Sequence, residues 1–214
     1  MSERDTHLWR DVLNALQSKL ETEAADIHLI IQGGKVVLSG VVDVYADKLA
    51  ADEAVRSVPG VEELENDLTV ATDGTIADKE IKSSIEEGLR QNHLPVVGIE
   101  VNQGEVFLQG KTNSLAVKHG ITAATSRVMG VKSVDDRGLQ IAETVDDASL
   151  TNAIEVAFVQ REVDAMDIHT ETHHGVAVLM GWVKDEVARN EALQAAARVP
   201  GVRRVVDRLR VRGS

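Results

Sequence analysis

This 214-residue chain lacks several residue types and patterns that carry common functions. It contains no cysteine, which excludes disulfides and thiolate metal sites and is typical of a reducing compartment. Aromatic residues make up only 2% of the chain, too few for the stacking platforms on which proteins bind single-stranded nucleic acid. We therefore expect no nucleic-acid partner.

Long apolar segments are also absent. No apolar run approaches the roughly 20 residues that span a bilayer, so we predict a chain that is not transmembrane and is peripheral to a membrane at most. The N-terminus is charged and lacks the basic start, apolar core and small-residue cleavage site of a secretory signal. We expect a cytoplasmic protein, or a periplasmic one if a leader has been removed.

Motifs for nucleotide binding and nucleophilic catalysis are missing as well. The chain has no Gly-x-x-x-x-Gly-Lys-Ser/Thr loop, and none of its serines stands in a nucleophile-elbow context. Carboxylate pairs such as Glu62-Glu63, Asp135-Asp136 and Asp146-Asp147 are interpreted as solvated residues of polar connections, because nothing in their sequence context would bury them. We predict a protein that is not an enzyme.

A threefold repeat dominates what the sequence does contain. Gly34, Gly40 and Gly60 recur 70 residues later and again 71 residues after that. The later copies are Gly104, Gly110 and Gly130, then Gly175, Gly181 and Gly201. A fixed period of this length predicts tandem modules, which we place at residues 1–72, 73–143 and 144–214.

Within each module the apolar pattern predicts the order helix, strand, strand, helix, strand. Apolar residues at helical spacing open the modules: Leu8, Val12, Leu16 and Leu20, then Ile76, Ile81, Ile85 and Leu89, then Leu150, Ile154 and Phe158. Alternating residues then predict a hairpin that turns at Gly33-Gly34, at Gln103-Gly104 and at His174-Gly175. Gly40, Gly110 and Gly181 end the second strand, where a positive φ or close packing would exclude a Cβ.

A second helix and a last strand complete each module. We expect Asp43 or Asn113 to cap this helix, and its apolar residues in the first copy to be Leu49, Ala50, Ala54 and Val58. The last strands are expected at 61–70, 131–141 and 202–211, with a bulge in the second because residues 135–139 include one extra residue. The predicted fold is α+β, with three tandem α-β-β-α-β modules, each a three-stranded mixed sheet with two helices on one face.

The second face of each sheet is not uniformly polar. The returning hairpin strand is apolar at both parities, as in Val36-Val37-Leu38 and Val106-Phe107-Leu108. A strand that is apolar on both sides is usually covered twice. Either a neighbouring module or another chain would supply the second cover, and the sequence leaves both open.

These features resemble the BON-domain family of bacterial osmotic-stress and nodulation-type repeats, and the resemblance covers all three modules. The family outline includes a glycine after the second strand and a Gly-Val step into a last strand that ends near Asn-x-Leu-x-Val. It is matched by Gly40, Gly60-Val61 and Asn66 to Val70, by Gly110 and Gly130-Val131, and by Gly181, Gly201-Val202 and Asp207 to Val211. Because these are turn and core positions, they predict the fold and leave the function open.

The resemblance implies a non-enzymatic protein linked to osmotic and envelope stress. Phospholipid binding has been proposed for several members and potassium binding for one that also carries a LysM module, and many members are periplasmic or are lipoproteins. This chain shows no lipobox cysteine and no LysM segment. A K⁺ site built from turn carbonyls would leave almost no trace in a sequence, so K⁺ stays a candidate ligand and no other cofactor is expected.

The candidate residues for a transition metal lie in the third hairpin. Alternation places His169, Glu171 and His173 on one strand face. The two histidines are four residues apart and hence roughly 13 Å apart along a strand, too far to share one ion without a bend. Exposed histidines in a polar strand are the preferred interpretation, and no metal is expected.

The C-terminal strand is the candidate anion surface. The net charge is -12, yet six arginines face only Asp207 among residues 198–212. Arg204, Arg208, Arg210 and Arg212 share one parity, so their guanidinium groups could meet lipid phosphates. In the first module Glu63 and Asp67 hold the positions of Arg204 and Arg208, which also predicts charge pairing within or between chains. Trp182 is expected beside this row. Its ring would either be buried against a neighbouring module or lie at the headgroup boundary of a membrane.

The sequence thus predicts a non-catalytic, stress-associated binding or scaffold protein that associates with anionic phospholipid surfaces or envelope partners. A potassium-binding sensor and a self-assembling structural protein are the alternatives.

Overall fold

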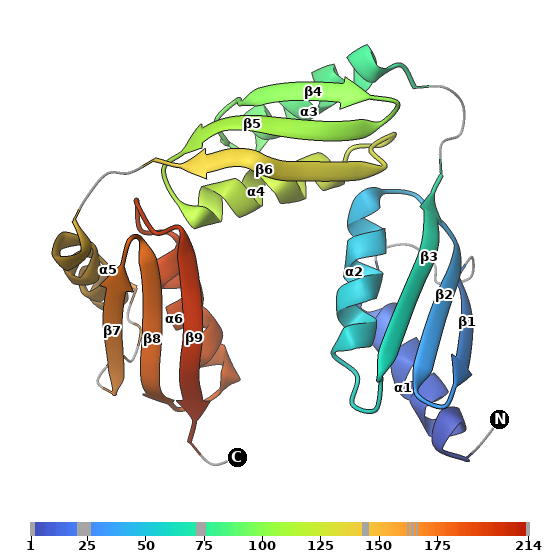
Figure 1. Ribbon diagram of the computed structural model, residues 1–214, viewed down its shortest axis with the longest axis horizontal. Coiled ribbons are helices and arrows are strands. Elements are labelled where there is room, and N and C mark those ends of the chain that lie inside the picture. The colour runs from blue at the N-terminus through green and yellow to red at the C-terminus, as the bar shows by residue number, and fades with distance from the viewer. Residues whose placement is uncertain are drawn as a thin grey trace. The chain divides into compact units, whose positions relative to one another are not determined.

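The computed structural model describes residues 3–20, 27–71, 76–142, 146–161, 163, 165 and 167–212, which form six helices and nine strands (Figure 1). The helices are α1 (Glu3–Lys19), α2 (Tyr45–Arg56), α3 (Asp78–Gln91), α4 (Leu115–Ser126), α5 (Asp147–Gln160) and α6 (Glu186–Ala197). The strands are β1 (Ile27–Gln32), β2 (Lys35–Val42), β3 (Glu63–Val70), β4 (Gly98–Asn102), β5 (Glu105–Thr112), β6 (Ser133–Ile141), β7 (Ile168–His173), β8 (Val176–Val183) and β9 (Arg204–Val211).

The strands form three sheets of the same topology, with orders β1-β2-β3, β4-β5-β6 and β7-β8-β9. In the first and third sheets the hairpin pair is antiparallel and the last strand is parallel to the central one. Each sheet carries its two helices on one face (Figure 1). The predicted α+β fold of three α-β-β-α-β modules is therefore confirmed.

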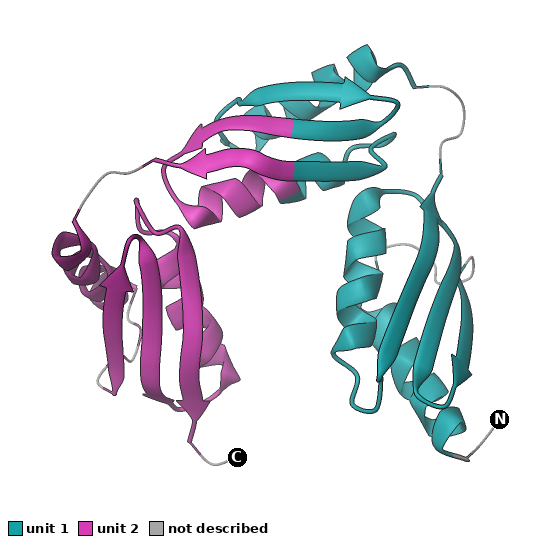
Figure 2. Ribbon diagram, in the orientation of Figure 1, with its two compact units in different colours: residues 1–107, 123–135 teal, residues 108–122, 136–214 magenta. Residues whose placement is uncertain are grey.

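By compactness the chain divides into two units, residues 1–107 with 123–135 and residues 108–122 with 136–214 (Figure 2). The first unit contains the whole β1-β2-β3 sheet and the second contains the whole β7-β8-β9 sheet. The division passes through β5, α4 and β6. The module boundaries expected at 72/73 and 143/144 lie outside the described residues and stay a prediction.

The hairpin turns have the backbone that the glycine positions predict. Both central residues of each turn have positive φ: Gly33 and Gly34 (60° and 84°), Gln103 and Gly104 (52° and 83°), and His174 and Gly175 (50° and 78°). This combination defines the tight turn whose twist matches that of the strands. The last of the three hairpins places β7 antiparallel to β8.

The glycine expected to end each central strand lies two residues before the end of the strand, but it has the expected conformation. φ is 128° at Gly40, 142° at Gly110 and 119° at Gly181. A Cβ at Gly181 would overlap the carbonyl oxygen of Asp167, which accepts a hydrogen bond from Trp182 N at 3.0 Å. The chain can approach itself this closely because glycine has no side chain.

In the first and third modules the core lies between the sheet and its two helices. In the first module Leu8, Val12 and Leu16 of α1 pack with Val36 and Leu38 of β2. In the third, Leu150, Ile154 and Phe158 of α5 pack with Ala177 and Leu179 of β8. The apolar positions predicted for the opening helices are therefore confirmed except Leu20 and Ile76, which lie outside α1 and α3.

The apolar face expected for the second helix of the first module is correct at Ala54 and Val58, which are buried, and wrong at Leu49. Leu49 is exposed, and the buried face of α2 consists of Asp47, Ala51, Ala54 and Val55. The sequence pattern misplaced the buried face of α2 because a short helix rich in alanine has several faces of similar polarity.

The cap residues lie one position later than the sequence suggested. Val44, not Asp43, is the N-cap of α2 and makes no side-chain cap. At α4 the Ser114 hydroxyl, not Asn113, accepts the hydrogen bond of Val117 N at 3.3 Å. At α6 Asp185 caps through Ala188 N at 2.8 Å. Asn113 instead accepts a hydrogen bond from Gly201 N at its carbonyl, at 2.9 Å.

The extra residue of the second module lies in β6, as expected. β6 has nine residues, whereas β3 and β9 have eight. Arg137 and Gly138 are both exposed and precede buried Leu139, so the alternation of the strand is interrupted there. An interruption of the alternation beside one extra residue is typical of a bulge.

Candidate anion-binding face

The face of the third sheet that points away from the helices combines an apolar strand with a basic one. On β8, Ala177, Leu179 and Val183 are buried against α5 and α6, so the residues between them point to the opposite face. The register pairs these residues with alternate residues of β9. We call this surface the arginine face: Val176, Val178, Met180 and Trp182 of β8 with Arg204, Val206, Arg208 and Arg210 of β9.

Trp182 is the largest side chain of the arginine face. It is 44% exposed, and the Arg210 guanidinium carbon lies 5.7 Å from the centre of its ring. A cation over an indole face gains roughly 0.5–1 kcal/mol at an exposed site. Residues 182 and 210 are register neighbours, so the third module itself pairs the indole ring with Arg210 and leaves it partly exposed; its burial against a neighbouring module stays a prediction.

Three of the four predicted arginines belong to the arginine face, and the fourth is engaged elsewhere. Arg204 and Arg208 are exposed, and no described residue forms a hydrogen bond or ion pair with either side chain. Arg212 follows the end of β9, and its Nη2 lies 2.6 Å from Asp167 Oδ2. The row available to an anion is thus Arg204, Arg208 and Arg210.

The acidic residue within the arginine row points away from it. Asp207 Oδ2 accepts a hydrogen bond from Arg189 Nε of α6 at 2.7 Å, and Asp207 Oδ1 accepts one from Leu209 N at 2.9 Å. The hydrogen bond to Asp207 raises the pKa of Arg189. Because the Asp207 carboxylate is held on the helix side of the sheet, it does not neutralise Arg204 or Arg208.

The candidate metal residues lie on the remaining strand of the same sheet. His169, Glu171 and His173 are exposed on one face of β7, while Thr170 and Thr172 are buried on the other. His169 Nε2 is 3.4 Å from Glu171 Oε1. Among the residues that the structure describes, no group of three or more metal-ligating side chains is close enough to hold an ion.

The first sheet presents an acidic counterpart of the arginine face. Register places Glu63 beside Lys35 in β2, as Arg204 lies beside Val176 in β8. We call the corresponding surface the acidic face: Lys35, Val37, Ser39 and Val41 of β2 with Glu63, Glu65, Asp67 and Thr69 of β3. Lys35 Nζ lies 3.0 Å from both Glu63 and Glu65, and these hydrogen bonds raise its pKa. Asp67 is exposed and has no described partner.

The carboxylate pairs do not all lie in connections. Glu63 is in β3, and Asp135 and Asp136 are in β6. Asp146 is the N-cap of α5, and hydrogen bonds from the Ser149 backbone and hydroxyl lower its pKa. These carboxylates therefore serve as caps and strand residues.

Sequence reasoning missed a recurrent aspartate that holds each hairpin turn. Asp147 accepts hydrogen bonds from His174 N at 2.9 Å and Gly175 N at 3.2 Å, which lower its pKa. Asp78 accepts from Gln103 N and Gly104 N in the same way, and Asp5 accepts from Gly33 N. Its spacing to the turn differs between copies, so a fixed-period comparison does not reveal it.

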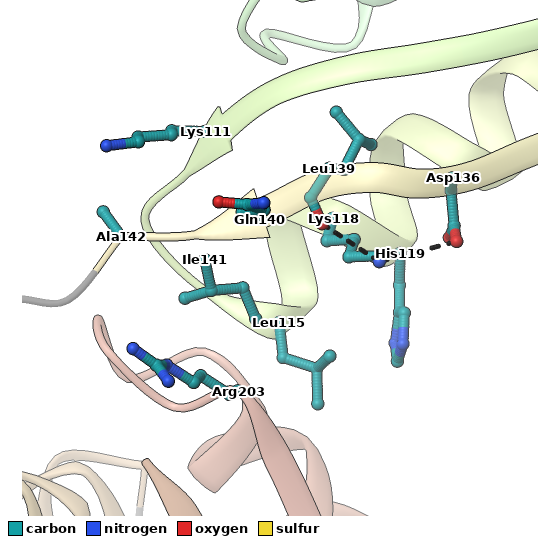
Figure 3. Close-up of a pocket in the computed structure, with 10 residues that line it drawn as sticks. All are labelled: Lys111, Leu115, Lys118, His119, Asp136, Leu139, Gln140, Ile141, Ala142 and Arg203. Carbon is teal, nitrogen blue, oxygen red and sulfur yellow. Dashed lines mark hydrogen bonds and ion pairs between the residues drawn. The ribbon is translucent and has the colours of Figure 1, made fainter. Parts of the chain in front are cut away.

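The second unit contains a pocket of about 860 Å³ that the sequence did not predict (Figure 3). It is lined by Lys111, Leu115, Lys118, His119, Asp136, Leu139, Gln140, Ile141, Ala142 and Arg203. Lys118 Nζ donates to the Leu139 carbonyl at 3.1 Å and lies 3.5 Å from Asp136 Oδ1. The ammonium group of Lys118 is therefore already paired.

The class of protein follows from the repeated sheet: the chain is a tandem array of small α+β modules. The family model of the BON domain matches residues 4–72, 77–143 and 146–213. The chain belongs to the BON-domain family, as the sequence motifs indicated.

Comparison with known proteins finds a relative in Escherichia coli and distant structural likenesses. The chain is 30% identical to osmotically-inducible protein Y of E. coli (strain K12) over 91 residues, 42% of this chain and 45% of that protein. It thus matches less than half the length of this relative.

None of the described helices combines the length and apolar character needed to cross a membrane.

Two solved structures from type III secretion systems also align. The C-terminal domain of CdsD of Chlamydia trachomatis aligns at 14% identity and a TM-score of 0.28, over 99% of each chain. The periplasmic domain of PrgH of S. typhimurium aligns at 14% identity and a TM-score of 0.24, over 92% of this chain and 99% of that chain. Likenesses this distant carry no argument about function.

Proposed function

We propose that this chain is a non-catalytic, stress-associated protein that binds anionic phospholipid surfaces through the arginine face of its third module. The observation that carries the proposal is the row of Arg204, Arg208 and Arg210 beside exposed Trp182 on one open sheet face. Guanidinium groups bind phosphate through paired hydrogen bonds, and indole rings favour the headgroup boundary. The link to stress is supported by the family and by the name of the osmotically inducible relative.

The binding that we propose is weak and depends on charge. With a net charge of -12 the whole chain is repelled by an anionic bilayer at long range, and each arginine contributes about 1 kcal/mol only within a Debye length of the surface. Three arginines together supply about 3 kcal/mol, a factor of about one hundred in partitioning. Neutral membranes offer no such gain, so the protein discriminates lipids by charge.

Co-sedimentation with vesicles tests this function. Wild type is compared on vesicles of phosphatidylcholine alone and on vesicles that also contain phosphatidylglycerol. We expect binding only to the anionic vesicles, and its loss in about 1 M salt, where the Debye length falls to about 3 Å. Replacing Trp182 by Ala and Arg204, Arg208 and Arg210 by Glu should lower the anionic partition coefficient by at least about a hundredfold.

A charge-matched control separates this face from net charge. Reversing Arg10, Lys79 and Lys82, which are exposed on α1 and α3, changes the net charge equally but leaves the arginine face intact. This control should retain most of the binding. Equal losses in both variants, or tight binding of wild type to neutral vesicles, would show that the arginine face is not the docking surface. Calorimetric titration with K⁺ against Na⁺ tests the ion-binding alternative on the same samples.

A further inference from the structure

The arginine face and the acidic face are two copies of one surface with opposite charge. Because the first and third sheets share topology and register, Glu63 takes the place of Arg204 and Asp67 that of Arg208. Their exposed edge strands thus run as two rows of side chains with the same spacing, about 7 Å between alternate residues. The two rows are equal in length and opposite in charge, so they are complementary.

Both faces also have an exposed apolar centre. In the first sheet Ile30 and Val41 are 61% and 48% exposed, and Ile30 pairs with Val37 in the register. In the third sheet Trp182 is 44% exposed beside half-buried Met180 and Val178. Apolar residues on a sheet face are usually covered by a second layer. The described helices cover only the opposite face of each sheet, so this layer is not supplied within either module.

We infer that the arginine face binds the acidic face of a second copy of this chain. Two sheets pack with their strands roughly aligned and about 10 Å apart. In that arrangement Val37, Val41 and Ile30 meet the apolar strand of the partner copy, and the arginine row meets Asp67 and the carboxylates around Lys35. The contact joins different surfaces of the two copies and leaves one of each unused, so it extends head to tail.

The size of the faces sets the strength of this contact. A sheet of three strands and about eight residues measures roughly 14 by 26 Å, so two faces bury on the order of 800 Å² in total. That area lies below the roughly 1,200 Å² of a standard stable interface. The association is therefore weak, concentration-dependent and sensitive to salt.

Charge complementarity favours a second copy over other occupants of the acidic face. That face repels anionic lipid, whereas the arginine face accepts either lipid or the acidic face of a partner copy. Variants of the acidic face consequently separate this inference from the proposed lipid binding. Glu63→Arg with Asp67→Arg removes self-association and leaves the lipid-binding residues untouched.

A charge-swap experiment on the full chain tests the inference by sedimentation velocity over a concentration series. Variant A carries Glu63→Arg and Asp67→Arg, and variant B carries Arg204→Glu and Arg208→Glu. In about 0.1 M salt the average mass of wild type should increase with protein concentration. In about 1 M salt this increase should disappear, because the Debye length falls from about 10 to about 3 Å. Each variant alone should stay monomeric.

Mixing the two variants is the decisive arm. The intact arginine face of variant A complements the intact acidic face of variant B, and the two reversed faces complement each other. An equimolar mixture should therefore recover the concentration-dependent association of wild type. A control with Asp11→Arg and Glu155→Arg, at exposed positions of α1 and α5, shifts the net charge as variant A does and should behave as wild type. Far-ultraviolet circular dichroism and melting curves establish that all variants are folded.

The inference would be overturned by wild type that does not associate, by variants that associate unchanged, or by a mixture that shows no recovery. A change in scattering radius at constant mass would also overturn it, because the faces would then pair within one chain. Loss of vesicle binding in variant B with full binding in variant A would leave the proposed function standing whichever way self-association turns out.

Discussion

At the scale of single residues, the repeated glycines act through backbone geometry. Gly181 combines a φ of 119° with a carbonyl oxygen, that of Asp167, at the place where a Cβ would lie. Gly88 of α3 is the opposite case, since its φ is not positive and a Cβ there would meet nothing within 4 Å. The same residue type is thus required at one position and replaceable at the other.

Substitution of these two glycines should change stability in opposite directions. Gly181→Val should lower the free energy of unfolding by roughly 1–3 kcal/mol, because the residue must leave its positive φ and displace the Asp167 carbonyl. Gly88→Ala should raise it by about 0.5–1 kcal/mol, since alanine is favoured inside a helix. Urea unfolding measures both. Unchanged midpoints in the two variants would contradict this account of the glycines.

At the scale of elements, each module is held together by polar contacts between a helix and the sheet. The first-turn aspartate of the opening helix binds the hairpin turn, as Asp147 binds His174 N and Gly175 N. A polar residue of the last strand contacts the second helix: Asn66 donates to the Lys48 carbonyl, Asp136 accepts from Thr122 Oγ1, and Asp207 accepts from Arg189. The asparagine or aspartate of the last-strand motif is therefore a link between elements.

The contact of Asp147 predicts a defined dependence of stability on pH. Hydrogen bonds from His174 N and Gly175 N lower the pKa of Asp147 below its ordinary value of 3.8. Its contribution is thus fully present above pH 3.8 and is lost as the pH falls through the lower folded-state pKa. Asp147→Asn should melt at a lower temperature than wild type at pH 7, and the difference should narrow below about pH 4.

The control for this prediction is Asp43→Asn. Asp43 is exposed, and no described residue forms a hydrogen bond with its side chain. Its melting temperature should follow wild type across the whole pH range. A constant gap between Asp147→Asn and wild type down to the acid limit would show that the turn contact does not depend on the charge of Asp147.

The sequence predicted the order of the elements because the repeat sampled the same pattern three times. It placed the glycines of the turns and all the apolar residues of the opening helices except Leu20 and Ile76 correctly, since steric and burial requirements act on single positions. It misplaced the cap of α2 at Asp43 because a polar residue near a helix start need not bond to it, and Val44 holds that position. The pocket around Lys118 and the turn contacts of Asp5, Asp78 and Asp147 require tertiary proximity, which no local pattern records.

The candidate site was predictable in part. Parity along one strand assigned Arg204, Arg208 and Arg210 to one side, and their positions relative to Glu63 and Asp67 followed from the repeat. The pairing of Arg212 with Asp167 was not predictable, because residue 167 lies before β7 and meets Arg212 only in the folded sheet. The exposure of Trp182 depends on what covers the sheet, which the pattern of one strand does not fix.

At the scale of the whole molecule, the first and third modules each have a core of their own. Leu38 belongs to the buried cluster of the first sheet, and Leu179 belongs to that of the third. Both side chains are fully buried at equivalent positions of the central strand. This arrangement allows one module to lose its packing while the other retains it.

Matched core truncations should therefore act locally. Leu179→Ala should destabilise the third module by about 2–5 kcal/mol, and hydrogen exchange should accelerate in β7, β8 and β9 while β1, β2 and β3 stay protected. Leu38→Ala should give the reciprocal pattern. Faster exchange throughout both sheets in either variant would show that the modules unfold as one cooperative unit.

The position of β9 at the border of its sheet gives its arginines another consequence. A border strand offers unpaired backbone N–H and C=O groups to which a strand of any other molecule can add, and charged side chains discourage this amyloid-like growth. Seven of the eight residues from Val205 to Arg212 are valine, leucine or arginine, so the strand depends on its arginines for solubility. Neutral replacements such as Arg208→Val would therefore promote aggregation, whereas the charge reversals used above preserve protection.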